Sequence, residues 1–143
     1  MKTGKLTSKT FVFLETHEAQ TINFLLDIGK DIEILVPVRS KGLRTPDIAM
    51  DGVCWEIKCP VGNGKYTIQR IFKHAVKQSE NIILDLRKTR LSDDICLHRL
   101  KAAIFVFKKH KALVSETPRA YATWYHPNAS FACPKFSHFV LKI

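Results

Sequence analysis

Residues 45–58, TPDIAMDGVCWEIK, constrain the fold more than any other part of this chain. At their centre lies Asp51-Gly52, a strong signal for a two-residue β-turn, because glycine tolerates the positive φ that a type I′ turn requires. The stretch therefore predicts a β-hairpin. Counting outward from this turn predicts the pairs Met50–Val53, Ala49–Cys54, Ile48–Trp55, Asp47–Glu56 and Thr45–Lys58.

One face of the predicted hairpin is charged, because side chains alternate along a strand and place Asp47, Glu56 and Lys58 together. Two carboxylates directly opposite each other repel and need an opposing positive charge. A divalent cation would supply it, since Mg²⁺ and Mn²⁺ prefer carboxylate oxygens. A solvated surface on which Lys58 pairs with both acids is the alternative. The opposite face is apolar and consists of Pro46, Ile48, Met50, Val53, Trp55 and Ile57.

Helices and strands alternate along the rest of the chain, which predicts an α/β fold with a mixed central sheet flanked by helices. Spacing of apolar residues, helix caps and apolar runs predict helices at 16–29, 66–80 and from Ser92 to about Lys101, and strands at 31–38, 81–86 and 136–143. Residues 102–107 suit either a helix or a strand.

Glu18 stands at the start of the first predicted helix, which has Thr16 as its expected N-cap and Gly29 as its stop. It precedes the apolar stripe of that helix by one turn, so its side chain is expected to point toward the sheet. An ordinary first-turn acid that interacts with the helix dipole is the alternative interpretation.

The chain is strongly basic, with 23 Lys and Arg against 13 Asp and Glu and a net charge of +10 over 143 residues. This balance favours an anionic partner, most often nucleic acid. Three aromatic residues, Tyr121, Trp124 and Tyr125, suit either base stacking or core packing. The basic side chains expected to attract phosphates are Arg70, Lys73, Lys77, Arg87, Lys88, Arg90, Lys108, Lys109, His110 and Lys111.

The cysteines argue against a structural zinc site, because Cys54, Cys59, Cys96 and Cys133 lack close pairing, and reduced thiols are expected. The first ten residues have no apolar core of a signal peptide, and no apolar run approaches the roughly 20 residues of a membrane span. Length predicts a single domain over residues 1–143. A domain cut from a longer secreted protein would show the same features.

The order of Glu18, Pro46-Asp47 and Glu56-Ile57-Lys58 resembles the PD-(D/E)XK nuclease superfamily. Residues 67–87, TIQRIFKHAVKQSENIILDLR, look like the region that follows this motif in the toxic C-terminal nuclease domains of contact-dependent growth inhibition proteins, CdiA. The resemblance extends from Glu18 to Arg87, and no motif is found from Ser92 onward.

The resemblance implies a restriction endonuclease-like fold and a metal-dependent nuclease. Glu18, Asp47 and Glu56 would bind Mg²⁺ or Mn²⁺, with Zn²⁺ as an alternative, and Asp47, Glu56 and Lys58 would be catalytic. It also implies a substrate of RNA, with tRNA favoured over DNA, in the cytoplasm of a target cell, and a cognate immunity protein that blocks the toxin. Phosphate contacts would come from Thr67 and Lys73, together with Gln69 or Gln78.

Two other functions stay open from the sequence. One is a DNA endonuclease of the same superfamily, of the resolvase or restriction type. The other is a noncatalytic nucleic-acid-binding module whose acidic residues are structural.

Overall fold

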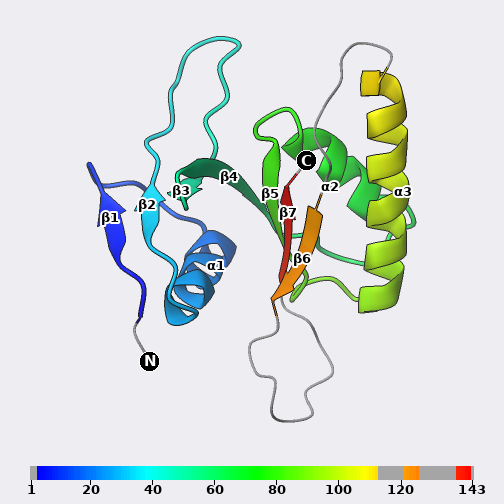
Figure 1. The fold of residues 1–143 in the computed structure, drawn as a ribbon, viewed down its shortest axis with the longest axis horizontal. Helices are drawn as coiled ribbons and strands as arrows, with labels where there is room; N and C mark the ends of the chain where they lie inside the picture. The colour runs from blue at the N-terminus through cyan, green and yellow to red at the C-terminus, as the bar shows by residue number, and fades with distance from the viewer. Residues whose placement is uncertain (1–2, 113–120, 126–137, 143) are drawn as a thin grey trace.

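The computed structural model describes residues 3–112, 121–125 and 138–142, with side chains as far as Phe107. Within these residues a seven-stranded sheet has the strand order β1-β2-β3-β4-β5-β7-β6 (Figure 1), which confirms the predicted mixed sheet flanked by helices. The elements are β1 (Leu6–Ser8), α1 (Thr16–Asp27), β2 (Ile32–Ile34), β3 (Ile48–Met50), β4 (Val53–Lys58), α2 (Thr67–Ala75), β5 (Asn81–Asp85), α3 (Asp93–Ala112), β6 (Tyr121–Tyr125) and β7 (His138–Lys142).

Both faces of the sheet are covered. β1–β2 and β4–β5 are parallel pairs, and the other neighbours are antiparallel. Alternate residues of β5 enter two different cores: Ile83 joins the one that α1 covers, whereas Ile82 and Leu84 join the one beneath α2 and α3. Figure 1 shows α1 close to β2, and α2 and α3 together beyond β5. β5 is therefore buried on both faces, as its apolar sequence predicts.

The predicted hairpin is confirmed in its turn and in its first three pairs. Asp51 and Gly52 have φ angles of 54° and 77°, the positive values that a type I′ turn requires. The register pairs Met50 with Val53, Ala49 with Cys54 and Ile48 with Trp55. Its predicted apolar face, including Trp55 and Ile57, packs into the core beneath α1.

The N-cap of helix α1 lies one residue before its predicted position, and the helix begins at Thr16. The N-cap is Glu15, not Thr16, because a capping box forms in which the Glu15 side chain accepts the backbone N–H of Glu18, and Glu18 Oε2 accepts that of Glu15 at 2.8 Å. The predicted stop is confirmed: Gly29 has φ 83°, and its N–H donates to the Leu26 carbonyl.

The other helices differ from prediction at their C-terminal ends. α2 ends at Ala75, earlier than expected, where a tight turn follows. α3 begins after Ser92, as predicted, and continues through residues 102–107 to Ala112, so these residues are helical. Ser92 Oγ accepts the Ile95 N–H at 3.4 Å.

Strand β2 is shorter than predicted, since it ends at Ile34. Residues 36–44 are all exposed, and Pro37 among them has no N–H to donate to a ladder. β7 confirms the predicted closing strand over residues 138–142. No helix in the described ranges combines the length and the apolar character that crossing a bilayer requires.

Candidate active site

Strand β4 changes its partner at Glu56. Its first half pairs with β3 as far as Trp55, and its second half pairs with β5 from Glu56 to Lys58. β3 and β5 therefore contact different halves of β4, and a gap opens beside the second half where β3 no longer follows. Glu56 stands at the point of this change.

The predicted pairs Asp47–Glu56 and Thr45–Lys58 do not form in the ladder. Asp47 instead donates its backbone N–H to the Trp55 carbonyl at 3.0 Å, and its Oδ2 accepts the Ile57 N–H at 2.7 Å. The Thr45 hydroxyl accepts the Val38 N–H at 2.9 Å. Because the Asp47 carboxylate replaces the next ladder bond to β4, its side chain is held at the gap.

Burial raises the pKa of Asp47, and the negative charge of Glu18 raises it further. The Ile57 N–H and the positive charge of Lys58 oppose this shift. Asp47 and Glu56 each affect the pKa of the other, so the two carboxylates lie close together.

Glu56 is only 1% exposed, which rules out the solvated surface that was the alternative interpretation. In the parallel register it lies beside Ile82, a core residue. Its Oε1 forms an ion pair with Lys58 Nζ, whereas its Oε2 is buried and has no hydrogen-bond partner among the described residues. Burial above all raises the pKa of Glu56 to about 7; Lys58 opposes the shift, and Asp47 and Glu18 add to it.

Glu18 lies near both acids, because its charge raises the pKa of each. It is half-buried, and its Oε2 is occupied by the Glu15 N–H in the capping box. Glu18 is therefore a first-turn acid of α1 whose charge acts on both carboxylates of the candidate site.

The two carboxylates give the site a negative charge that suits a cation, but the described side chains do not form a complete set of metal ligands. In the part of the chain described, no group of three or more His, Cys, Asp and Glu side chains is arranged to hold a metal ion. Two carboxylates nevertheless converge, and one buried oxygen of Glu56 has no hydrogen-bond partner within the described part of the chain. An unsatisfied buried carboxylate oxygen is costly, and a divalent cation is one group that satisfies it.

The residues predicted to bind nucleic acid lie along α2 and at its ends. Gln69 and Lys73 line a groove against α3, and Arg70, Lys73 and Lys77 are exposed. Thr67 is the first residue of the helix, and Gln78 is half-buried just beyond its end.

Arg87 was predicted to contact nucleic acid, but in the structure its guanidinium group is bound to Asp85. Its Nε and Nη2 donate to Asp85 at 2.9 and 2.6 Å, and Asp85 also accepts the hydroxyl of Thr21 at 3.3 Å. Asp85 is 1% exposed, and its hydrogen bond with Thr21 joins the end of β5 to α1. Sequence reasoning missed Asp85 and Thr21, although an acid that ends an apolar strand two residues before an arginine was the available signal.

Cys59, next to Lys58 in the chain, contributes a thiol whose pKa is raised by burial and then by the charge of Asp85. Cys54, Cys59 and Cys96 are free thiols, as predicted. Lys88 and Arg90 are exposed. The remaining predicted side chains lie beyond those that the structure describes: Lys108, Lys109, His110, Lys111, Tyr121, Trp124, Tyr125 and Cys133.

Comparison with protein families gives one match. The model described as "Contact-dependent growth inhibition CdiA C-terminal domain" matches residues 44–115, half of the chain, and this range includes Asp47, Glu56 and Lys58 but not Glu18. Searches of the curated proteins and of the solved structures found no match. The chain therefore belongs to the family of CdiA C-terminal domains of contact-dependent growth inhibition.

Proposed function

We propose that this chain is the toxin domain of a contact-dependent growth inhibition protein and that it acts as a metal-dependent nuclease of the PD-(D/E)XK type. One observation carries the proposal. Glu56 is a buried carboxylate with one oxygen that no described residue bonds, it is paired with Lys58, and Asp47 lies beside it. A purely structural ion pair has no need of the second acid, which adds repulsion at a buried position.

Asp47 and Glu56 would hold the cation, with Glu18 as the third carboxylate. Mg²⁺ or Mn²⁺ is favoured over Zn²⁺, because the donors are carboxylates and not thiolates or imidazoles. When bound, the metal would polarise the scissile phosphate and lower the pKa of a water molecule. The Ile57 N–H fixes one oxygen of Asp47 at 2.7 Å, so the orientation of this acid is set before any ligand arrives.

Lys58 is the group proposed to act on the phosphate. Its Nζ is held against Glu56 Oε1, and its side chain is 28% exposed, so it reaches solvent at the end of β4. From this position its ammonium would position the attacking water and stabilise the negative charge that develops on the phosphate. β5 supports the reacting end of β4, because Lys58 pairs with Leu84 of the core.

The net charge supports the proposed nucleic-acid substrate, and the family supports the proposed immunity partner. A net charge of +10 favours a polyanionic substrate, and we favour tRNA over DNA, as the sequence resemblance implies. Membership of a growth-inhibition family supports delivery into the cytoplasm of a target cell and a cognate immunity protein that blocks the toxin.

The test is cleavage of total tRNA and of plasmid DNA by the purified protein with Mg²⁺, Mn²⁺ or EDTA. We expect tRNA cleavage that EDTA abolishes and that Glu56→Gln and Lys58→Ala each reduce by at least about a hundredfold, the lower range for general acid–base and electrostatic groups. Glu33→Gln is the matched control, because Glu33 is a strand acid paired at the surface with Lys9.

Activity that survives EDTA and both substitutions would overturn the metal-dependent mechanism. Cleavage of plasmid but not of tRNA would transfer the proposal to a DNA endonuclease. Tight binding of nucleic acid without cleavage under any metal condition would identify a noncatalytic binding module.

A further inference from the structure

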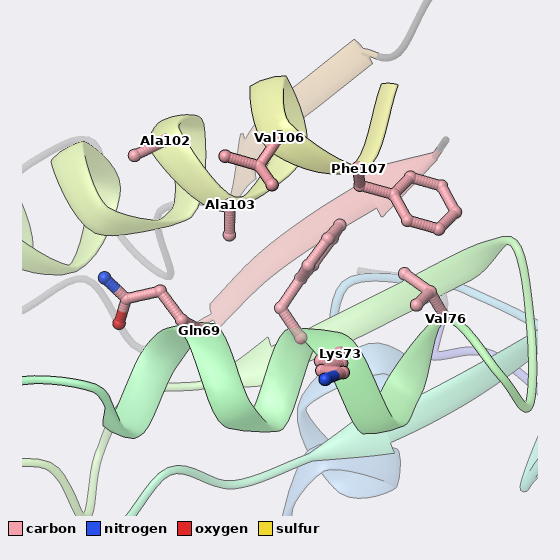
Figure 2. Close-up of a pocket in the computed structure, with 8 residues that line it drawn as sticks. Gln69, Lys73, Val76, Ala102, Ala103, Val106 and Phe107 are labelled. Atoms are coloured by element: carbon pink, nitrogen blue, oxygen red, sulfur yellow. The ribbon is translucent and has the colours of Figure 1, made fainter. Parts of the chain in front are cut away.

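A groove between α2 and α3 lies apart from the residues assigned to catalysis. It has a volume of about 470 Å³, within the range typical of small-ligand pockets. α3 contributes Ala102 and Ala103, whose small side chains leave space opposite Gln69 on α2 (Figure 2). At the other end Phe72 and Phe107 meet edge to face, with ring centroids 5.8 Å apart. The groove is therefore open at the alanines and closed by aromatic rings.

Gln69 is a polar side chain in this mostly apolar space. Figure 2 shows it extending from α2 toward Ala102 and Ala103. Its Oε1 is buried and has no hydrogen-bond partner among the described residues. Leaving such a group unsatisfied costs about 1–3 kcal/mol. Its amide presents a donor and an acceptor side by side, so it suits a ligand edge that also carries both.

The mouth of the groove is cationic. A second hollow, of about 430 Å³, shares Gln69 and Lys73 with the groove and adds Tyr66 and Arg70. Arg70 and Lys73 are exposed, and neither forms an ion pair with an acid in the described part of the chain. Tyr66 is 57% exposed, and Lys65 Nζ lies 5.3 Å from its ring centroid. Positive charge therefore gathers where the apolar groove opens.

We propose that this groove binds an unpaired nucleobase of a single-stranded nucleic acid, with Gln69 contacting the base edge and Arg70 and Lys73 contacting the adjacent phosphate. A base is flat and largely apolar on its faces but has donors and acceptors on its edge, which matches the aromatic and alanine walls and the Gln69 amide. A base within a duplex cannot enter, because both its faces are stacked and its edge is paired. The inference rests on the proposed function and assigns part of its substrate.

The test measures binding without cleavage, by fluorescence anisotropy of a labelled short single-stranded RNA of mixed sequence in EDTA. A duplex of the same length is the reference. Ala102→Phe fills the groove from an exposed position, and Gln69→Leu removes the amide while keeping its approximate size. We expect each to weaken single-strand binding about tenfold, within the range for one stacked base, to leave duplex binding unchanged and not to lower the thermal midpoint.

Two matched controls accompany these variants. Ala102→Ser keeps the space open, and Gln20→Leu makes the same amide deletion on the exposed face of α1, so both are expected to bind as the original protein does. Glu56→Gln is expected to abolish cleavage but to keep single-strand binding, which separates this inference from the proposed function.

Unchanged single-strand affinity in both groove variants would overturn the inference. An equal loss for single strand and duplex would also overturn it, because that pattern reports general attraction to phosphates. Unchanged affinity together with self-association that Ala102→Phe abolishes, measured by sedimentation, would assign the groove to a protein contact instead.

Discussion

Glu56 is a glutamate whose surroundings oppose its ionisation. It is almost fully buried beside Ile82, and the neighbouring Asp47 repels its charge, while Lys58 compensates in part. Removing Lys58 would leave two acids in the gap without a cation. In the metal-free protein, burial and the charge of Asp47 both destabilise the ionised form of Glu56. A bound cation would offset both effects, so the same arrangement favours cation binding.

The stability of the metal-free protein should therefore fall with rising pH. The pKa of Glu56 is about 7 in the folded protein against 4.5 in the unfolded chain, so the folded state holds the extra proton between these values. The stability that Glu56 gains by binding this proton in the folded state is fully present below pH 4.5 and is lost as the pH rises through about 7. The shift corresponds to at most about 3 kcal/mol. Urea unfolding in EDTA at pH 5 and pH 8 measures it.

Glu56→Gln provides the comparison for this pH effect, because an amide of the same shape does not titrate. The pH-dependent loss should be smaller in this variant by the amount that Glu56 contributes, whatever other groups add to both proteins. An identical pH dependence in the two proteins would contradict the raised pKa of Glu56.

The β3–β4 hairpin is the element that builds the site. Its turn sets the register, and the register places the end of the β3 ladder next to Glu56. Asp47 then bonds Ile57 through its side chain where the backbone ladder stops. A shift of one residue would move every side chain of β4 to the other face and separate the acids.

Gly52→Ala should destabilise the protein by about 1–2 kcal/mol, because Gly52 has φ 77° and a Cβ is strained in this region although no neighbour contacts it. Thermal or urea unfolding measures the loss. Asp51→Asn is the matched control, since asparagine tolerates its φ of 54° and only the surface ion pair with Lys30 is lost. Equal losses in both variants would show that the ion pair, and not the backbone angle, stabilises the turn.

Sequence reasoning succeeded where local chemistry decides the structure. Asp51-Gly52 predicted both the turn and three strand pairs, and alternation predicted which residues of β4 face the core. It failed where a distant or competing contact decides: the Glu15–Glu18 capping box displaced Thr16 as N-cap, and the side chain of Asp47 replaced a backbone pair. The Asp85–Arg87 pair is local, but the contact between Asp85 and Thr21 joins segments far apart in the chain, which no local pattern reveals.

At the scale of the whole molecule, the cations whose side chains are described divide into those with and those without an ion-pair partner among the described residues. Lys9 and Lys30 form ion pairs with Glu33 and Asp51, at 3.6 and 2.8 Å. Arg70 and Lys73 have no ion-pair partner in the described residues. A net charge of +10 attracts any polyanion, but unpaired cations gathered on one surface give the attraction a direction.

The affinity of Glu56→Gln protein for nucleic acid in EDTA should therefore fall steeply as the salt concentration rises. Part of this salt dependence should come from Arg70 and Lys73. Each phosphate contact with a single strand contributes about −0.7 to the slope of log affinity against log salt concentration, so Arg70→Ala with Lys73→Ala should reduce the slope by about 1.4. Lys9→Ala with Lys30→Ala removes the same charge from already paired positions, and its slope should change much less. Equal reductions would mean that overall charge alone, without a localised surface, draws the nucleic acid to this fold.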